Sequence, residues 1–238
     1  MGNPHYVVRD QGLIAYMNLT DIGVWSCGRT SSSRCPNKMI RSFHDTTLTD
    51  ILLTKLAELQ NNVFFAGFEP VFQEKCKKHQ VPFVQRTQNS ATVDQPASEI
   101  YNFLESQPYE LMLHINACVP FLRTSTIVEF LERCVGDGRP CFGVFNRINY
   151  FTFTDGTPIN WPDDLTTINT KNVSPVYEFA HVFYFFEKQY FVENGWFWDW
   201  KDVRYIEIPG GLETFDIDHE EDFLMAETLW RGLHHSVE

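Results

Sequence analysis

The chain has 238 residues, of which 43% are hydrophobic and 15% aromatic, enough apolar material for one α/β domain with at most a small appendage. A formal net charge of −12 argues against a general nucleic-acid binder, because the surface of such a protein is basic. No apolar run reaches the length of about 18 residues that a membrane span needs, and residues 1–10 lack the features of a signal peptide.

Strands and helices are expected to alternate over residues 22–145. Short apolar runs predict strands at 22–27, 63–67, 81–85, 111–116 and 141–145. Apolar residues at helical spacing predict helices at 48–60, 71–79, 97–104 and 125–134. This alternation predicts a mostly parallel sheet covered by helices on both faces, which is a three-layer α/β sandwich. Ligands of such sheets bind beyond the carboxyl ends of the strands, where we expect Arg29 and Asn116.

The alternation stops from residue 146 to about residue 176. A β-hairpin is predicted around Asp155 and Gly156, and the remainder of this stretch is polar and rich in proline. A strand at 182–186, a helical turn at 188–193 and a final helix at 218–233 are expected to follow. Residues 1–20 are expected to be an N-terminal extension, with an added edge strand, and residues 21–238 to be the main domain.

Six cysteines are present, and none forms a Cys-x-x-Cys pair, so the spacing typical of a zinc site is absent. Several of them lie in apolar runs, where a buried free thiol is the usual explanation. Because no secretion signal is visible, we expect reduced cysteines and a cytoplasmic location.

The segment directly after the first predicted strand reads GRTSSSRCPNK at residues 28–38. A turn that joins a strand to a helix exposes backbone N–H groups at the helix N-terminus, where a phosphate is favoured. Arg29, Arg34 and Lys38 add three cations to this loop in a protein that is acidic overall. The loop is therefore predicted to bind a polyphosphate, and the alternative is a solvated surface.

Near the other end of the chain, the segment FDIDHEEDF places Asp216 and Asp218 two positions apart. On an extended segment both side chains point to one side. Two carboxylates beside a substrate phosphate suit Mg²⁺, so we expect this cofactor here. The alternative is that the pair precedes and caps the final helix, and Asp218 could serve both purposes.

These motifs resemble those of the sugar-acid cytidylyltransferases. The pattern Arg-x-x-Ser-x-Arg-x-Pro-x-Lys, which begins at Arg29, resembles the signature loop of that family. The segment that begins at Asp216 resembles the metal-binding segment of the acylneuraminate branch, which makes CMP-activated sialic acids. The stretch INACVPFLRT, which begins at Ile115, resembles the central strand end at which the family meets the sugar. The three motifs occur in the order found in the family, over residues 22–229.

The resemblance implies a Rossmann-like, GT-A-like nucleotidyltransferase fold, in which residues 146–180 form a small extension for homodimerisation and for the sugar pocket. It implies transfer of CMP from CTP to an acidic 2-keto sugar, sialic-acid-like or a related ulosonic acid, with release of pyrophosphate. The implied nucleotide-binding residues are Arg29, Ser32, Arg34, Lys38 and Arg86, the sugar-binding residues are Asn116 and Tyr184, and the metal ligands are Asp216 and Asp218. Catalysis would depend on Arg29, Lys38, Asp216 and Asp218.

The sequence departs from the family at positions that face the sugar. Cys118 and Val119 replace a Thr-Ser pair, Ala180 and His181 replace the Asn-Gly before the pocket tyrosine, and Met39 replaces a common asparagine. We therefore expect an acidic sugar other than N-acetylneuraminate, or weak activity. Two alternatives stay open, namely a non-catalytic relative that binds a nucleotide or a sugar, and a metal-dependent glycosyltransferase.

Overall fold

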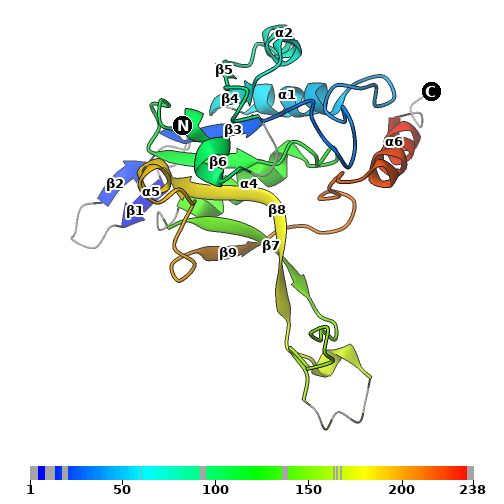
Figure 1. Ribbon diagram of the computed structural model, residues 1–238. Helices are drawn as coiled ribbons and strands as arrows, with labels where there is room; N and C mark the ends of the chain where they lie inside the picture. Colours follow the sequence, from blue (N-terminus) through cyan, green and yellow to red (C-terminus); the bar gives the residue numbers. More distant parts are fainter. Residues whose placement is uncertain are drawn as a thin grey trace.

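A seven-stranded sheet with the order β5-β4-β3-β6-β8-β7-β9 forms the centre of the computed structural model (Figure 1). The structure describes residues 5–8, 14–17, 21–59, 61–91, 95–135, 139–162, 164, 166 and 168–234. The strands of this sheet are β3 (Gly23–Cys27), β4 (Asn62–Gly67), β5 (Phe83–Gln85), β6 (Leu111–Ile115), β7 (Cys141–Arg147), β8 (Val176–Glu187) and β9 (Arg204–Glu207). β8 runs antiparallel to both of its neighbours, and the other pairings are parallel. The predicted mostly parallel sheet is confirmed.

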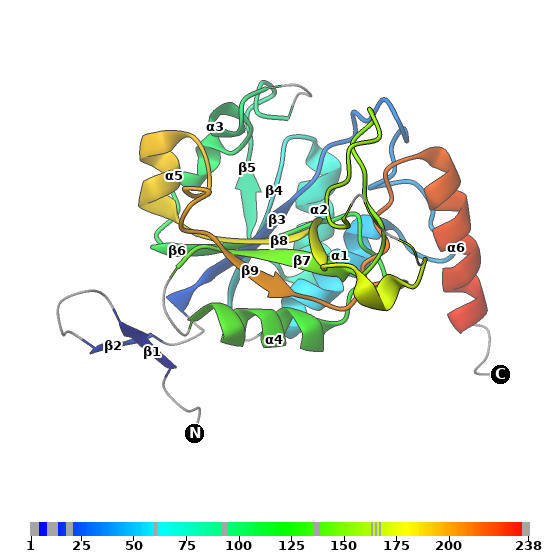
Figure 2. The ribbon, with the colours of Figure 1, turned by 90° about the horizontal axis from the view of Figure 1, so that it is seen from below.

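Helices cover both faces of the sheet (Figure 2). The helices are α1 (Leu48–Glu58), α2 (Pro70–His79), α3 (Ala97–Ile100), α4 (Thr124–Val135), α5 (Lys188–Asn194) and α6 (Glu220–His234), with short 3₁₀ turns at Asn102–Leu104 and Thr170–Asn172. α1, α2, α4 and α6 contribute to one hydrophobic cluster, which receives Leu113 of β6. The 3₁₀ turn after α3 and the helix α5 contribute to the other, which receives Met112. Neighbouring residues of a strand point to opposite faces, which gives the three layers.

The elements expected over residues 22–145 are present, with their ends moved by a few residues. The predicted helix 97–104 is divided at Tyr101 into α3 and a 3₁₀ turn. The strand expected at 182–186 begins earlier, at Val176, and the final helix begins at Glu220. β9 was not predicted, because only Ile206 of its four residues is buried and the apolar signal is therefore weak.

β7 and β8 continue beyond the core as a two-stranded arm (Figure 1). Their pairing shifts register between Phe142 and Val144, and β8 pairs with β6 only over residues 183–187. The described residues within 146–180 belong to the arm. The predicted hairpin there is a tight turn in which Phe153 N donates to Thr157 O at 2.8 Å.

The prediction that the N-terminal extension adds an edge strand to the main sheet is wrong. β1 (His5–Val8) and β2 (Ile14–Met17) pair with each other in a separate antiparallel sheet. Two segments joined by a short connection lose little entropy on pairing locally, whereas joining the main sheet would require contact with β5 or β9, the strands at its edges. The remaining residues of 1–20 lie outside the described part of the chain. No helix among the described residues has the length and apolar character needed to cross a bilayer.

Candidate active site

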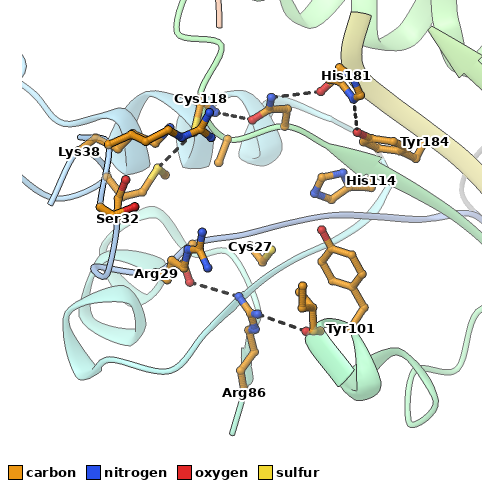
Figure 3. Close-up of a pocket in the computed structure, with 17 residues that line it drawn as sticks. Cys27, Arg29, Ser32, Lys38, Arg86, Tyr101, His114, Cys118, His181 and Tyr184 are labelled. Carbon is orange, nitrogen blue, oxygen red and sulfur yellow. Dashed lines mark hydrogen bonds between the residues drawn. The ribbon is translucent and has the colours of Figure 1, made fainter. Parts of the chain in front are cut away.

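A pocket of about 620 Å³ lies beyond the carboxyl ends of the central strands (Figure 3). β3 and β6 are neighbours in the sheet, although two strands separate them in the sequence, so the direction of winding reverses between them. Ligands of open α/β sheets bind at such a reversal. Most of the predicted site residues line the pocket, namely Arg29, Ser32, Arg34, Lys38, Arg86, Asn116 and Tyr184. Tertiary structure therefore gathers residues that are spread over most of the sequence.

The loop after β3 forms one side of the pocket (Figure 3). Gly28 N donates to Ala66 O at 3.1 Å, which extends the pairing of β3 with β4. A Cβ atom at Gly28 would lie 2.9 Å from Phe65 Cζ and 3.0 Å from Phe72 Cε1, so this position requires glycine. Ser32 Oγ accepts from Cys35 N at 3.3 Å and so shapes the loop.

The loop prediction assumed that a helix begins directly after the loop, and this premise is wrong. α1 begins only at Leu48, where Thr47 caps it, and turns that include Asn37 with a φ of 55° occupy the intervening chain. The helix N-terminus is therefore distant in sequence from the loop, because the turns end locally and do not continue into α1. Attraction of an anion to this loop depends on its cations and on its own N–H groups.

The loop contacts the C-terminal carboxylate motif directly. The guanidinium of Arg34 donates to both oxygens of Asp218, at 2.8 and 3.2 Å. Lys38 Nζ donates to Ile217 O and lies 3.8 Å from Asp218 Oδ1. Two motifs that are almost two hundred positions apart in the sequence thus form one site.

The alternative role for Asp216 and Asp218 was to cap the final helix, but a different residue, Asp222, makes the hydrogen bonds at that end. Asp222 Oδ2 accepts from Asp218 N at 3.1 Å and from His219 N at 2.7 Å, so a side chain of the first turn of α6 reaches back to the N–H groups just before the helix. The side chain of Asp218 is directed to Arg34 instead.

Asp216 is the most perturbed acid of the site. Asp216 Oδ2 accepts from Asn116 Nδ2 at 3.1 Å, whereas Oδ1 is buried and accepts no hydrogen bond from the described residues. Burial, followed by the charge of Asp218, raises the pKa of Asp216 to about 6. A buried carboxylate oxygen without a donor is a suitable ligand for a hard cation.

The carboxylate pair fits a metal that is shared with a substrate. Among the described residues there is no group of three or more His, Cys, Asp or Glu side chains that could hold an ion alone. Mg²⁺ is commonly bound by one or two carboxylates together with substrate phosphates and water. Asp216 and Asp218 supply two carboxylates beside the cations of the loop at residues 28–38, here called the phosphate loop after its predicted ligand, which matches this arrangement.

Asn116 connects three parts of the site. Its Nδ2 donates to His181 O and to Asp216 Oδ2, each at 3.1 Å, and its Oδ1 accepts from Cys118 N at 2.9 Å. Both amide hydrogen atoms are thus used within the protein. The structure places Asn116 as a positioning residue, and its contact with a sugar stays a prediction.

Arg86 is buried in the pocket wall. Its guanidinium donates to Ser90 Oγ at 3.0 Å and to Ser90 O. It also donates to Ile100 O at 3.2 Å and to Gly28 O at 3.5 Å (Figure 3). These bonds tie the segment before α3 to the start of the phosphate loop. A direct contact between Arg86 and a nucleotide stays a prediction.

Tyr184 lies on the opposite side of the pocket from the loop cations (Figure 3). Its ring stacks on Phe197 and Trp198, with centroid distances of 5.3 and 5.9 Å. Its hydroxyl lies 3.0 Å from His181 Nδ1. Burial raises the pKa of Tyr184 to about 12, so the hydroxyl keeps its proton at neutral pH.

The sequence analysis assigned no binding role to several residues that line the pocket, among them Tyr101, His114 and His181. His114 lies in the apolar run of β6, where a single histidine carries no distinguishing signal. Burial lowers the pKa of His114 to about 3, so its imidazole is neutral. His181 is the one with a usable signal, because it replaces a family glycine. Cys118 also lines the pocket, and burial raises the pKa of its thiol to about 11, which argues against an activated nucleophile.

Comparison with known proteins defines the family and the fold. The model of the cytidylyltransferase family matches residues 28–191, which is more than half of the chain. No curated protein matches the sequence significantly. A CMP:2-keto-3-deoxy-manno-octonic acid synthetase complexed with CTP superposes with a TM-score of 0.65 at 10% identity, covering 89% of this chain and 99% of that chain.

Two further structures share the fold. A 4-diphosphocytidyl-2C-methyl-D-erythritol synthase from Anaerococcus prevotii has a TM-score of 0.62 at 12% identity, covering 90% of this chain and 98% of that one. A cytidylyltransferase from Leptospira borgpetersenii serovar Hardjo-bovis has a TM-score of 0.56 at 14% identity, with coverages of 88% and 86%. The expected nucleotidyltransferase fold is confirmed. With the family match over its central part, the chain belongs to the cytidylyltransferase family and is a nucleotidyltransferase.

Proposed function

We propose that the protein transfers CMP from CTP to an acidic 2-keto sugar, sialic-acid-like or a related ulosonic acid, and releases pyrophosphate. One observation carries this proposal: Arg34 and Lys38 of the cationic loop line the pocket and contact Asp218 and Ile217 of the carboxylate segment. A polyphosphate needs cationic side chains and its counter-cation needs carboxylates, so the two sets of groups must lie side by side. The family match supplies the nucleotidyl transfer, and the sequence motifs indicate the acidic sugar.

The barrier to this reaction is mainly electrostatic. A sugar hydroxyl attacks the α-phosphorus of CTP, and negative charge grows on the oxygens of the leaving pyrophosphate. Positioning and charge stabilisation supply most of the rate enhancement in phosphoryl-type transfers. In this proposal Arg29 and Lys38 bind the β- and γ-phosphates, and the hydroxyl of Ser32 donates to a phosphate oxygen. Arg34, which also lines the pocket, assists this binding.

In the proposed complex Asp216 and Asp218 hold Mg²⁺. When bound, this ion neutralises phosphate charge and polarises the phosphoryl group. Without nucleotide, Arg34 and Lys38 are the groups that neutralise Asp218. With nucleotide bound, Arg34 and Lys38 would be available to pair with the phosphates, and Asp216 and Asp218 would hold the ion.

The acylneuraminate branch is the proposed branch because of the Asp216-x-Asp218 motif, but the fold does not select the acceptor. The structural neighbours include one enzyme named for an octonic acid and one named for a methylerythritol product. The altered side chains near Tyr184 favour an acid other than N-acetylneuraminate.

A homodimer formed through the arm is part of the proposal. Ile148, Phe153 and Ile159 lie on the arm and are 58%, 58% and 47% exposed. Apolar side chains gathered on a projecting segment mark an interaction surface. The arm therefore supports association with a second copy.

Thermal unfolding with CTP, UTP, ATP and GTP, each with and without Mg²⁺, tests the nucleotide half of the proposal. We expect a shift that is selective for CTP and dependent on Mg²⁺, because a ligand of the folded state stabilises it by about 2.7 kcal/mol at a hundred times its Kd. Asp216→Ala should abolish the Mg²⁺ dependence. Glu221→Ala, which removes an exposed carboxylate of the same segment, is the matched control and should retain it.

Pyrophosphate release with CTP and a panel of eight- and nine-carbon sugar acids tests the transfer itself. Product formation with one of these acids supports the proposal. Absence of any nucleotide shift would instead favour the non-catalytic alternative, and transfer from a sugar nucleotide without CTP would favour a glycosyltransferase.

A further inference from the structure

β8 bends sharply where it passes from the core sheet into the arm (Figure 1), and His181 lies at this bend. Phe142 pairs with Tyr184 while Val144 pairs with Phe179, so residues 180–183 are left over opposite one residue of β7. Such an irregularity re-aims a side chain. The imidazole of His181 is aimed at the pocket that it lines.

The backbone of His181 has a φ of 52°, in the left-handed region. Glycine adopts this conformation without a steric cost, whereas a residue with a Cβ atom does so at a cost of about 1–2 kcal/mol. The bend would therefore be formed more easily by glycine. Since the backbone does not require an imidazole here, the side chain needs a separate explanation.

Hydrogen bonds fix the position of His181 and the direction of its ring. Its carbonyl oxygen accepts from Asn116 Nδ2 at 3.1 Å, and Asn116 also holds Asp216. Its Nδ1 lies 3.0 Å from the hydroxyl of Tyr184 (Figure 3). That hydroxyl stays protonated and can donate to Nδ1, which leaves the ring proton on Nε2. In this tautomer Nε2–H is a hydrogen-bond donor, and no described residue accepts from it.

The charges of the pocket are unevenly distributed. Among the described lining residues, the groups that are always cationic belong to Arg29, Arg34, Lys38 and Arg86. The first three lie on the phosphate loop, and Arg86 is bonded to the loop at Gly28 O. The opposite side is formed by Tyr101, His114, His181 and Tyr184 (Figure 3), and Asn116 lies beside them through its hydrogen bond to His181 O.

On this opposite side few groups can receive a carboxylate. His114 is held neutral by burial, and both amide hydrogens of Asn116 are donated within the protein. Tyr184 directs its hydroxyl to His181. His181 is exposed, lines the pocket, and in the tautomer described has a hydrogen-bond donor on Nε2.

We propose that His181 binds the carboxylate of the acceptor sugar through Nε2 and thereby sets the preference of the enzyme for acidic over neutral acceptors. This inference rests on the proposed function. Tyr184 then acts as a positioning residue, because its hydroxyl holds the ring that makes the contact.

Substitution of His181 by glycine and by asparagine tests the proposal. Both residues tolerate a positive φ, so the bend should be preserved, and we expect melting temperatures equal to or above that of the wild type. His181→Gly removes the donor, whereas His181→Asn keeps a shorter one. The substrates are the sugar acid that the wild type uses best and the carboxamide of the same sugar, which is isosteric and neutral.

For His181→Gly we expect kcat/KM for the acid to fall about tenfold to a hundredfold, the range for loss of a hydrogen bond to a charged group. The loss should appear mainly in KM for the acid, with KM for CTP unchanged. Activity with the carboxamide should fall much less, so that the preference for the acid over the amide shrinks by about tenfold or more. His181→Asn should give intermediate values.

An equal loss for the acid and the carboxamide would show a structural role only and would overturn the inference. Unchanged kinetics in His181→Gly would overturn it as well. If the wild type itself forms no CMP-sugar from any acid, the proposed function fails first, and the wild-type measurement alone reveals this. The two failures are therefore distinguishable.

Discussion

At the scale of single residues, position changes the chemistry of ordinary side chains. Asp216 and Asp218 belong to one short segment, yet Asp216 is partly buried, with an enclosed Oδ1 and a raised pKa, while Asp218 is half-exposed and paired with Arg34. Lys38 reaches the same segment from the loop and contacts Ile217 O. The site thus depends on a few contacts, each of which a single substitution can remove.

Lys38→Met is expected to lower kcat/KM for CTP by about 10²–10³-fold, the usual cost of removing one donor that stabilises developing charge. The melting temperature should change little, because the apolar part of the side chain is retained. Steady-state kinetics with varied CTP measures the effect. Lys77→Met, at an exposed position of α2, is the matched control and should behave as the wild type. A similar loss in both variants would contradict the assigned role.

Gly28→Ala is expected to lower the free energy of unfolding by about 1–3 kcal/mol, because the new Cβ atom would overlap the rings of Phe65 and Phe72. Urea denaturation measures this change. Gly210→Ala is the control, since its nearest neighbour would be Phe145 Cδ1 at 3.8 Å, an ordinary contact. Equal stability of the two variants would show that the loop can move away at no cost.

At the scale of elements, a charge cluster joins α1 to α2. Asp50 of α1 accepts from Lys75 Nζ at 2.6 Å and pairs with His79 Nε2 at 2.8 Å, and both partners lie on α2. Burial raises the pKa of Asp50, but the hydrogen bonds from Lys75, Thr47 and His79 outweigh this effect and hold the pKa well below its ordinary value. The ionised carboxylate therefore stabilises the contact between the helices.

Asp50→Asn is expected to cost about 2–3 kcal/mol at pH 7, somewhat less than full loss of a buried pair because the cluster is partly exposed. A depressed pKa gives stability that is present above the unfolded value of about 3.9 and is lost as the pH falls through the lower folded value. The difference from the wild type should therefore shrink between pH 5 and pH 2, as urea titrations at several pH values would measure. Asp45→Asn, at an exposed loop position, should show no such difference.

At the scale of the whole molecule, the proposed dimer interface on the arm lies apart from the folded core. The core clusters are built from the sheet and its helices, whereas the exposed apolar residues Ile148 and Phe153 lie on the arm. A change on the arm can therefore alter the oligomeric state without unfolding the core.

The double variant Ile148→Ser, Phe153→Ser is expected to weaken self-association at least about tenfold, because it removes apolar area from the proposed interface. Sedimentation velocity over a concentration series measures this association. The core should stay folded in the double variant, as its thermal unfolding would show. Leu224→Ser, which removes an exposed apolar side chain from α6, should not change association. A wild type that is monomeric at all concentrations would contradict the dimer.

The sequence by itself determined the alternation of strands and helices and the two chemical motifs. Periodicity and apolar runs are local properties, and a buried parallel strand such as β6 is a continuous apolar segment wherever it lies. The loop of residues 28–38 and the Asp216 segment were equally readable, because their residue types and spacing are local too.

Only the tertiary structure decided what these local features meet. The bond between Arg34 and Asp218, the buried oxygen of Asp216 and the bend that directs His181 into the pocket all depend on segments brought together across the sheet. Burial and pKa follow from the neighbours of a group in space, so no window of sequence contains them. Weakly apolar β9 was missed for the same reason, because it is a strand through its pairing with β7.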